Sequence, residues 1–327
     1  MNLKNPIKKL TEEIIINKYL RKLNFKKFGT FNFENDAAFV NLNKNNKMVI
    51  TSDSISENID FFKYDDPKSI ACKIITSNLS DLSAMGVNPY AYSLNLFLPK
   101  YIDNQWMNKF SNELFKKQKQ YNFYLIGGDL SKSNKIHISA TFFGLSNLNK
   151  IVSQNIARLN QDIWITGNLG DSFVGLQILK NKININNSKT KNYFVNKYYY
   201  PKPCIIGSKV SQFVSSMKDI SDGFVGDLKK MLNNNYGAML YVNSLPLSTN
   251  LKNLVKNGII KEKDILNSGD NYELIFFSSS KNRKKIISIG KKFKVKLTLI
   301  GKIIKKKVIL NDSNHRLNIP KEFDHFS

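Results

Sequence analysis

The sequence predicts an α/β protein with two domains, on three observations. The chain has 327 residues, which is enough for two domains of ordinary size, and its hydrophobic content of 42% is enough for two cores. Short apolar or alternating runs typical of strands take turns with segments in which apolar residues recur at helical spacing. A polar stretch over residues 146–152 divides these elements into two series. We therefore expect an N-terminal domain over residues 1–150 and a C-terminal domain over residues 151–327.

The N-terminal domain begins with helical spacing of apolar residues over 6–22. Proline suits the first turn of a helix and glycine its end, so a second helix is expected from Pro67 to just before Gly86. An apolar run that begins at Tyr124 predicts a strand that stops at two glycines, with Asp129 at its end. The other expected elements are strands at 37–43, 47–52, 90–98 and 135–145 and a helix at 103–119.

The C-terminal domain opens with a strand at 162–166, a glycine-rich turn and a helix to about Leu179. Residues 183–195 are rich in asparagine and lysine and are expected to form a loose connection, after which Pro201 and Pro203 begin a helix. The basic run from Lys302 to Lys307 is expected on a solvated edge strand. The other expected elements are a strand that ends near Ile220, a helix from Asp222, strands at 238–242, 272–278 and 296–303, and helices at 248–257 and 281–290.

The net charge of +25 has two interpretations, a nucleic-acid-binding protein or a compositional bias spread over solvated surfaces. The lysines are scattered, and neither a zinc-finger pattern nor an aromatic RNA-stacking motif is present, which favours the second interpretation. No apolar run approaches the ~20 residues of a membrane span. Two cysteines far apart in the sequence suit a reducing compartment. We therefore expect a cytoplasmic protein that binds neither membrane nor nucleic acid.

Two aspartates, Asp219 and Asp222, stand three residues apart around the apolar Ile220. The pattern places Asp219 at the end of a strand and Asp222 at the start of a helix, where α/β proteins commonly hold cations and phosphates. The alternative is that Asp222 only caps the helix and Asp219 is a surface carboxylate. The glycine-rich turn Thr166-Gly167-Asn168-Leu169-Gly170-Asp171-Ser172 resembles a phosphate cradle, but it lacks the lysine of a Walker motif.

Aspartates amid small or apolar residues recur along the chain, and this favours a metal site. A carboxylate in such surroundings is costly unless it meets a cation or hydrogen-bond donors. Oxygen ligands without a histidine or cysteine cluster disfavour zinc and suit several Mg²⁺ ions, each bound also by water and substrate phosphate. The six aspartates are Asp36, Asp53, Asp81, Asp129, Asp219 and Asp222.

A polymetal site would solve a problem of charge. If a phosphate attacks the γ-phosphate of ATP, each pair of unit charges about 4 Å apart repels by roughly 4 kcal/mol at an effective dielectric constant of ~20, and four such pairs repel by roughly 16 kcal/mol. Several Mg²⁺ ions would neutralise this repulsion, and in-line positioning of the two phosphates would supply the rest of the catalysis.

The chain resembles the thiamine-monophosphate kinases, of the superfamily that includes aminoimidazole ribonucleotide synthase and selenophosphate synthetase. The resemblance rests on eight motifs, found in order over nearly the whole chain. They are Asn35-Asp36-Ala37-Ala38, Thr51-Ser52-Asp53, Asn78-Leu79-Ser80-Asp81-Leu82-Ser83-Ala84-Met85-Gly86, Leu125-Ile126-Gly127-Gly128-Asp129, the glycine-rich turn, Asp219-Ile220-Ser221-Asp222-Gly223, Ser268-Gly269-Asp270-Asn271-Tyr272-Glu273-Leu274 and Phe323-Asp324-His325-Phe326.

The resemblance implies a two-domain, aminoimidazole ribonucleotide synthase-like fold. Its N-terminal mixed sheet with helices would pair in a homodimer, and its C-terminal domain would be α/β. The implied reaction transfers the γ-phosphate of ATP directly to thiamine monophosphate with the help of several Mg²⁺ ions, and gives thiamine diphosphate and ADP.

The site residues that the resemblance implies fall into three groups. The metal group is Asp36, Thr51, Ser52, Asp53, Asp81, Asp129, Asp219 and Asp222. Five of these are also expected to be catalytic: Asp53, Asp81, Asp129, Asp219 and Asp222. The ATP group is Gly128, Asp129, Ser221 and Gln154. The substrate group is Asp60, Asp270 and Phe323.

Four positions depart from the usual pattern of the family. Asn35 stands where an aspartate is common, Asp60 replaces a histidine, Gln154 replaces an arginine near ATP, and Ser268-Gly269-Asp270-Asn271-Tyr272 replaces Gly-Gly-Glu-Asp-Tyr. Because these changes cluster at substrate contacts, another ATP-dependent enzyme of the superfamily with a different acceptor is an alternative. A basic nucleic-acid-binding protein is a second alternative, although it gives no reason for the six aspartates.

Overall fold

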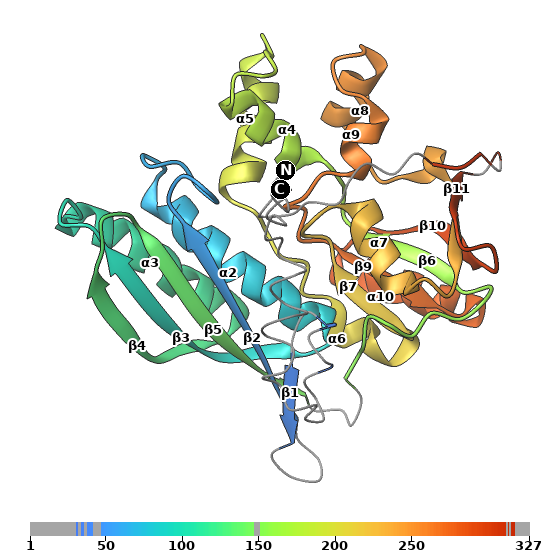
Figure 1. Cartoon of the computed structure of the whole chain (residues 1–327), viewed down its shortest axis with the longest axis horizontal. Helices are drawn as coiled ribbons and strands as arrows, with labels where there is room; N and C mark the ends of the chain where they lie inside the picture. Colours follow the sequence, from blue (N-terminus) through green and yellow to red (C-terminus); the bar gives the residue numbers. More distant parts are fainter. Residues whose placement is uncertain are drawn as a thin grey trace, which may run out of the picture.

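The computed structural model describes residues 31, 34–35, 38–41, 47–146, 151–311, 313 and 315–317. The helix expected at 6–22, Asp36 and Phe323 lie outside these residues. The described strands form two sheets, which lie side by side in Figure 1 with a long helix between them. None of the helices in this part of the chain has the length and apolar character needed to span a lipid bilayer.

The first sheet has five strands and is mixed, as expected. Neighbouring strands run antiparallel except for β3 and β4, which are parallel. Two helices cover one face, and the apolar residues between them and the sheet form one core. In spatial order the strands are β1 (Ala38–Asn41), β2 (Lys47–Ser56), β5 (His137–Ser146), β3 (Asn88–Leu98) and β4 (Tyr124–Lys132). The helices are α2 (Pro67–Ala84) and α3 (Asn104–Tyr121).

Helix α2 confirms the expected helix between Pro67 and Gly86. Pro67 occupies the first turn, and the Asp66 carboxylate before it accepts a hydrogen bond from the Lys68 N–H at 3.0 Å. After the helix, Gly86 has φ +76°, a left-handed conformation that glycine adopts without strain. Almost every residue of α2 is buried, because the helix packs on β2 and β5 and also contacts the second sheet. The helix thus joins the two domains.

The second sheet has six strands and carries the remaining helices. Strands β6 and β9 are buried along their whole length, because alternate side chains enter two different apolar clusters on opposite faces of the sheet. In spatial order the strands are β11 (Ile309–Asn311), β8 (Gly237–Leu240), β10 (Leu297–Ile304), β6 (Asp162–Thr166), β9 (Leu274–Ser278) and β7 (Ser216–Asp219). The helices are α4 (Asp171–Leu179), α5 (Ser188–Tyr199), α6 (Gly207–Val210), α7 (Phe224–Leu232), α8 (Thr249–Lys256), α9 (Glu262–Leu266) and α10 (Arg283–Phe293).

The prediction of a loose connection at residues 183–195 is wrong, because most of this segment belongs to α5. The Asn187 side-chain oxygen caps this helix by accepting a hydrogen bond from the Thr190 N–H at 2.9 Å. Phe194 and Tyr198 are the side chains that it buries, so its polar composition reflects one solvated face. The helix expected at the two prolines is also displaced, because α6 begins only at Gly207.

Two further expectations are corrected by strand pairing. Strand β4 does not stop at its glycines but continues to Lys132, because its parallel pairing with β3 resumes after an irregularity at Ile126. Asp129 therefore lies within the strand and not at its end. The basic run from Lys302 does not mark an edge, because β10 lies between β8 and β6 and the following lysines form a turn.

Candidate active site

Strand β2 and helix α2 bring three predicted metal residues to one face of the first sheet. Asp53 shares this face with the buried Thr51, because alternate residues of a strand point the same way. The Thr51 hydroxyl donates a hydrogen bond to the Asp81 carboxylate on α2 at 2.6 Å. Ser52 points to the opposite face, where its hydroxyl lies 3.0 Å from that of Thr141. Asp53 and Asp81 thus lie on the side that faces the second domain.

The motif after β7 holds its two aspartates next to lysines. Asp219 is only 1% exposed, and its carboxylate lies 3.5 Å from the buried Lys218 ammonium. Lys218 also lies 3.6 Å from the carboxylate of Asp227, which sequence reasoning missed. Asp222 pairs with Lys230 at 2.9 Å. These lysines offset the negative charge of the motif.

Asp222 is not the cap of α7, so that alternative is wrong. The residue before the helix is Gly223, with φ +136°. The Asp227 carboxylate accepts hydrogen bonds from the N–H groups of Asp222 and Gly223, both at 3.3 Å. Asp227 thus holds the turn in place and leaves the Asp222 carboxylate directed to Lys230. The sequence signal for this role of Asp227 was its place in the first turn of a helix that begins directly after Gly223.

Carboxylates of both domains act electrostatically on one buried side chain, Tyr272. Burial raises the pKa of Tyr272, and the negative charges of Asp270, Asp53 and Asp219 raise it further. The Tyr272 hydroxyl donates a hydrogen bond to the Asp270 carboxylate at 3.1 Å. Asp270 and Tyr272 both have left-handed backbones, with φ +54° and +51°, a strained conformation that is often found at functional sites. The structure therefore places predicted metal residues and a predicted substrate residue at the domain junction.

Asp129 does not join this group within one chain. Asp53 pairs with Ala140, whose partner on β3 is Leu94, and Leu94 pairs with Gly128 on β4. Three spacings between strands, or about 14 Å along the sheet, separate Asp53 from Gly128 and the neighbouring Asp129. Asp129 is exposed, and its carboxylate accepts a hydrogen bond from the Ser131 hydroxyl at 2.7 Å.

The donor atoms of the predicted metal residues fit a hard cation. They are carboxylate and hydroxyl oxygens, which Mg²⁺ prefers. In the described part of the chain, no three side chains of histidine, cysteine, aspartate or glutamate lie close enough together to hold an ion by themselves. An ion here would therefore complete its shell with water and substrate phosphates, as Mg²⁺ commonly does.

The glycine-rich turn is not an open phosphate cradle. Its amides are already bound to protein oxygens: Gly167 donates to Lys296, Leu169 to Pro246, and Gly170 to the Asn271 side chain, at 2.9, 2.8 and 2.8 Å. Since Asn271 is a neighbour of Asp270 and Tyr272, the turn supports the loop that bears them.

Glu273 packs directly against this turn. Gly167 has φ +55°, which favours glycine, and a Cβ added there would displace the Glu273 carboxylate, which would lie 1.8 Å away. The Thr166 hydroxyl donates a hydrogen bond to Glu273, while it accepts one from the Leu274 N–H at 2.8 Å. Burial raises the pKa of Glu273 to about 7.

Asn35 and Gln154 meet on another side of the junction. The Asn35 side-chain oxygen accepts hydrogen bonds from the Gln154 N–H at 2.9 Å and the Ser153 hydroxyl at 3.3 Å. Within the described residues, the Asn35 amide nitrogen and the Gln154 side-chain oxygen are buried without a hydrogen-bond partner. Buried polar atoms of this kind are rare in proteins and suit contact with a polar ligand.

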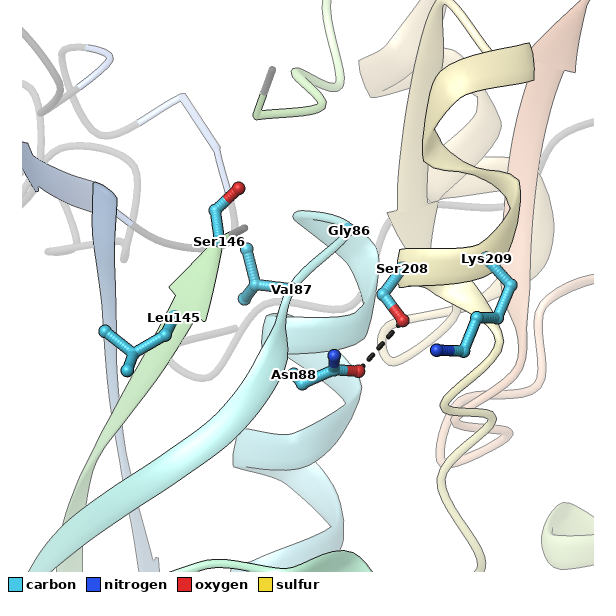
Figure 2. A pocket seen from close by; sticks show the side chains of 7 residues that line it. All are labelled: Gly86, Val87, Asn88, Leu145, Ser146, Ser208 and Lys209. Carbon is cyan, nitrogen blue, oxygen red and sulfur yellow. Dashed lines mark hydrogen bonds between the residues drawn. The ribbon is translucent and has the colours of Figure 1, made fainter. Parts of the chain in front are cut away.

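Two cavities in the described part of the chain contain no predicted site residue in their linings. Figure 2 shows one of about 160 Å³ where the domains meet near the end of α2, with Ser208 donating a hydrogen bond to Asn88 at 2.8 Å. The other, of about 420 Å³, lies beside the glycine-rich turn, with Tyr193, Ser248 and Lys296 in its lining. The candidate site is thus defined by the side chains at the junction.

The comparisons with known proteins agree with this architecture. The N-terminal domain of AIR synthase related protein matches residues 34–146, and the C-terminal domain of the same family matches residues 161–311. The fold and the aspartate-lined junction therefore define a two-domain protein of the AIR synthase related class.

More specific relatives are the thiamine-monophosphate kinases of two Buchnera aphidicola subspecies. The enzyme of Buchnera aphidicola subsp. Schizaphis graminum is 38% identical over 76% of this chain and 76% of its own length. The enzyme of Buchnera aphidicola subsp. Acyrthosiphon pisum is 34% identical over 84% of this chain and 85% of its own length. The solved structure of AaThiL complexed with AMPPCP and TMP has a TM-score of 0.85 at 25% identity, over 99% of this chain and 100% of the other. The chain belongs to the thiamine-monophosphate kinase family.

Proposed function

We propose that this protein transfers the γ-phosphate of ATP directly to thiamine monophosphate, giving thiamine diphosphate and ADP. The observation that carries the proposal is the packing of α2, whose Asp81 is hydrogen-bonded to Thr51, on β7 and β9 of the second domain, which end at Asp219 and begin next to Asp270 and Tyr272, respectively. This packing joins the metal side and the substrate side of the site across the two domains. The relatives named thiamine-monophosphate kinase and the AaThiL complex with an ATP analogue support the same reaction.

Each part of the site has a role in this proposal. Magnesium ions would neutralise the phosphates, held by the residues of the metal group other than Ser52, whose hydroxyl points to the opposite face of the sheet. These residues are Asp36, Thr51, Asp53, Asp81, Asp129, Asp219 and Asp222. Gly128, Ser221 and Gln154 would contact ATP, which accords with the unpartnered Gln154 oxygen. Asp60, Asp270 and Phe323 would orient the acceptor. Because the reaction needs only positioning and charge neutralisation, no phosphorylated residue is invoked.

A homodimer that pairs N-terminal domains along β4 belongs to the proposal. This strand is the edge of its sheet and is exposed along nearly its whole length, including Ile126 at 55% and Leu130 at 69%. An exposed apolar edge strand is normally covered by another chain or element. Asp129 lies on the same strand, so this pairing would place it at the interface between the two subunits. We place the domain boundary near residue 150 and expect the enzyme to act in the cytoplasm.

The test is to incubate the purified protein with ATP, Mg²⁺ and thiamine monophosphate and to measure thiamine diphosphate by its fluorescence after oxidation. The proposal predicts one ADP for each thiamine diphosphate formed. If ATP binds in the presence of Mg²⁺ but no thiamine diphosphate appears, the acceptor is wrong and other phosphorylated acceptors should be screened.

A further inference from the structure

A buried lysine, Lys73 of α2, joins the two domains on the acceptor side of the junction. Its side chain is 6% exposed, and its ammonium donates a hydrogen bond to the main-chain oxygen of Asp60 at 3.1 Å. The same ammonium lies 3.6 Å from the centre of the Tyr198 ring, a cation–π contact. The Tyr198 hydroxyl donates to the same Asp60 oxygen at 3.3 Å. Lys73, Asp60 and Tyr198 therefore form a closed set of contacts, with Tyr198 supplied by α5 of the second domain.

These contacts fix Asp60 at both its main chain and its side chain. The Ser56 N–H donates a hydrogen bond to the Asp60 carboxylate at 2.7 Å, while Lys73 and Tyr198 hold the carbonyl. On one side of Asp60, Ile59 is 74% exposed, and on the other side Phe61 is buried in the core of the first domain. Phe61 thus anchors the segment, and the polar contacts set the position of Asp60 within it.

The surrounding charges explain how an ammonium is held there. Burial lowers the pKa of Lys73, whereas the carboxylates of Asp270, Asp65 and Asp60 raise it. Desolvation of an ammonium is tolerated only where opposite charges and acceptors offset it. Lys73 therefore lies in the field of Asp60 and Asp270, the two described residues of the proposed acceptor site.

We infer that Lys73 is a positioning residue that sets the affinity for the phosphorylated acceptor by clamping Asp60 to Tyr198 across the domain junction. The inference rests on the proposed function, because that proposal assigns Asp60 and Asp270 to the acceptor. Lys73 is not proposed to touch ATP or the transferred phosphate. Its loss is therefore expected to change the KM for the acceptor and to leave the KM for ATP unchanged.

The test compares Lys73→Met, which keeps an apolar chain over the Tyr198 ring but removes the ammonium, with Tyr198→Phe, which removes one hydroxyl. Lys68→Met, at an exposed position of the same helix, is the matched control. A hydrogen bond from a charged group is worth roughly tenfold or more in an equilibrium constant, so Lys73→Met is expected to raise the KM for thiamine monophosphate about tenfold. Tyr198→Phe should raise it by a smaller factor, and the control should leave it unchanged.

Hydrogen exchange of the amides in residues 57–62 provides a readout that needs no substrate. The clamp predicts faster exchange in Lys73→Met and Tyr198→Phe than in the wild type and the Lys68→Met control. If Lys73→Met does not fold, Tyr198→Phe still provides the test. Equal KM values for thiamine monophosphate, or a parallel rise in the KM for ATP, would overturn the inference. If the wild type makes no thiamine diphosphate, the proposed function fails, and unchanged exchange would then also overturn the clamp.

Discussion

At the scale of single residues, Asp53 and Asp222 bear most directly on the proposed chemistry. They approach the junction from different domains, on β2 and on the turn before α7. Asp222 pairs with Lys230 at the surface, where an ion pair contributes little to stability. Asp53 is only partly buried, so both aspartates are suited to substitution without loss of the fold.

We expect Asp53→Asn and Asp222→Asn each to lower kcat by roughly 10²–10³-fold, since a charged group that stabilises the transition state is lost. The melting temperature should change little in either variant. Glu262→Gln, at an exposed position of α9, is the control for the loss of a negative charge. Wild-type turnover in both aspartate variants would refute the polymetal model.

Glu273 makes stability depend on pH with a definite sign. Its pKa is raised from 4.5 to about 7 in the folded protein, so the folded state binds the proton more tightly than the unfolded state does. The stability that this proton contributes is complete below about pH 4.5 and is lost as the pH rises through about 7. The raised pKa values of Asp65 and Asp171 act in the same direction.

The melting temperature of the wild type is therefore expected to fall between pH 5 and pH 8 by more than that of Glu273→Gln, which stays neutral throughout. The comparison isolates Glu273, because Asp65 and Asp171 are present in both proteins. Melting curves that run parallel over this range would show that Glu273 titrates as an ordinary carboxylate.

At the scale of elements, strand β4 depends on close approach of two backbones. A Cβ on Gly128 would lie 1.8 Å from the Leu94 carbonyl oxygen, whereas a Cβ on Gly127 would meet nothing within 4 Å. The two glycines have nearly the same φ, +153° and +157°, so they differ chiefly in contact with β3. Comparing alanine substitutions at Gly127 and Gly128 therefore separates the effect of steric crowding from the effect of backbone strain.

Gly128→Ala is expected to lower the free energy of unfolding by about 1–3 kcal/mol more than Gly127→Ala does, the usual cost of overpacking. Denaturant unfolding of the two variants measures the difference. Equal values would mean that β4 shifts away from β3 to accommodate the methyl group.

At the scale of the whole molecule, the proposed homodimer and the active site are coupled. About 14 Å along one sheet separates Asp53 from Asp129, so Asp129 would act at the subunit interface and not beside Asp53. The exposed apolar residues of β4 lie on the same strand as Asp129. Dissociation is therefore expected to lower activity as well as to expose an edge strand.

Leu130→Glu should convert the dimer to a monomer and reduce turnover, because it places charges against each other on an apolar edge. Ile287→Glu, at a 44% exposed position of α10, is the control and should remain dimeric. Sedimentation velocity of both variants and of the wild type gives the oligomeric state. A monomeric wild type with full activity would contradict the proposed dimer.

The elements that local chemistry controls were predictable. Proline and glycine delimit α2, and continuous apolar runs identify β6 and β9. Helix α5 was not recognised, because a helix that buries only Phe194 and Tyr198 has too weak a periodicity. The predicted end of β4 was also wrong. A glycine that ends a strand cannot be distinguished by sequence from a glycine that allows a neighbouring backbone to approach closely.

For the site, the order of motifs in the chain was enough to select the family and nearly all of the proposed residues. The partners of those residues were not predictable: Lys73 with Asp60 and Tyr198, and Lys218 with Asp219 and Asp227. Lysines are scattered over the whole sequence, so composition did not distinguish these buried ones from the exposed majority.

The sequence by itself thus determined the fold class, the family and the kind of chemistry, because strand and helix periods, caps and ordered motifs are local properties of the chain. Only the tertiary structure decided which carboxylates meet. Asp53 and Asp219 converge near Tyr272 because two sheets pack against one shared helix, and Asp129 stays apart because its strand lies at the far edge of the first sheet.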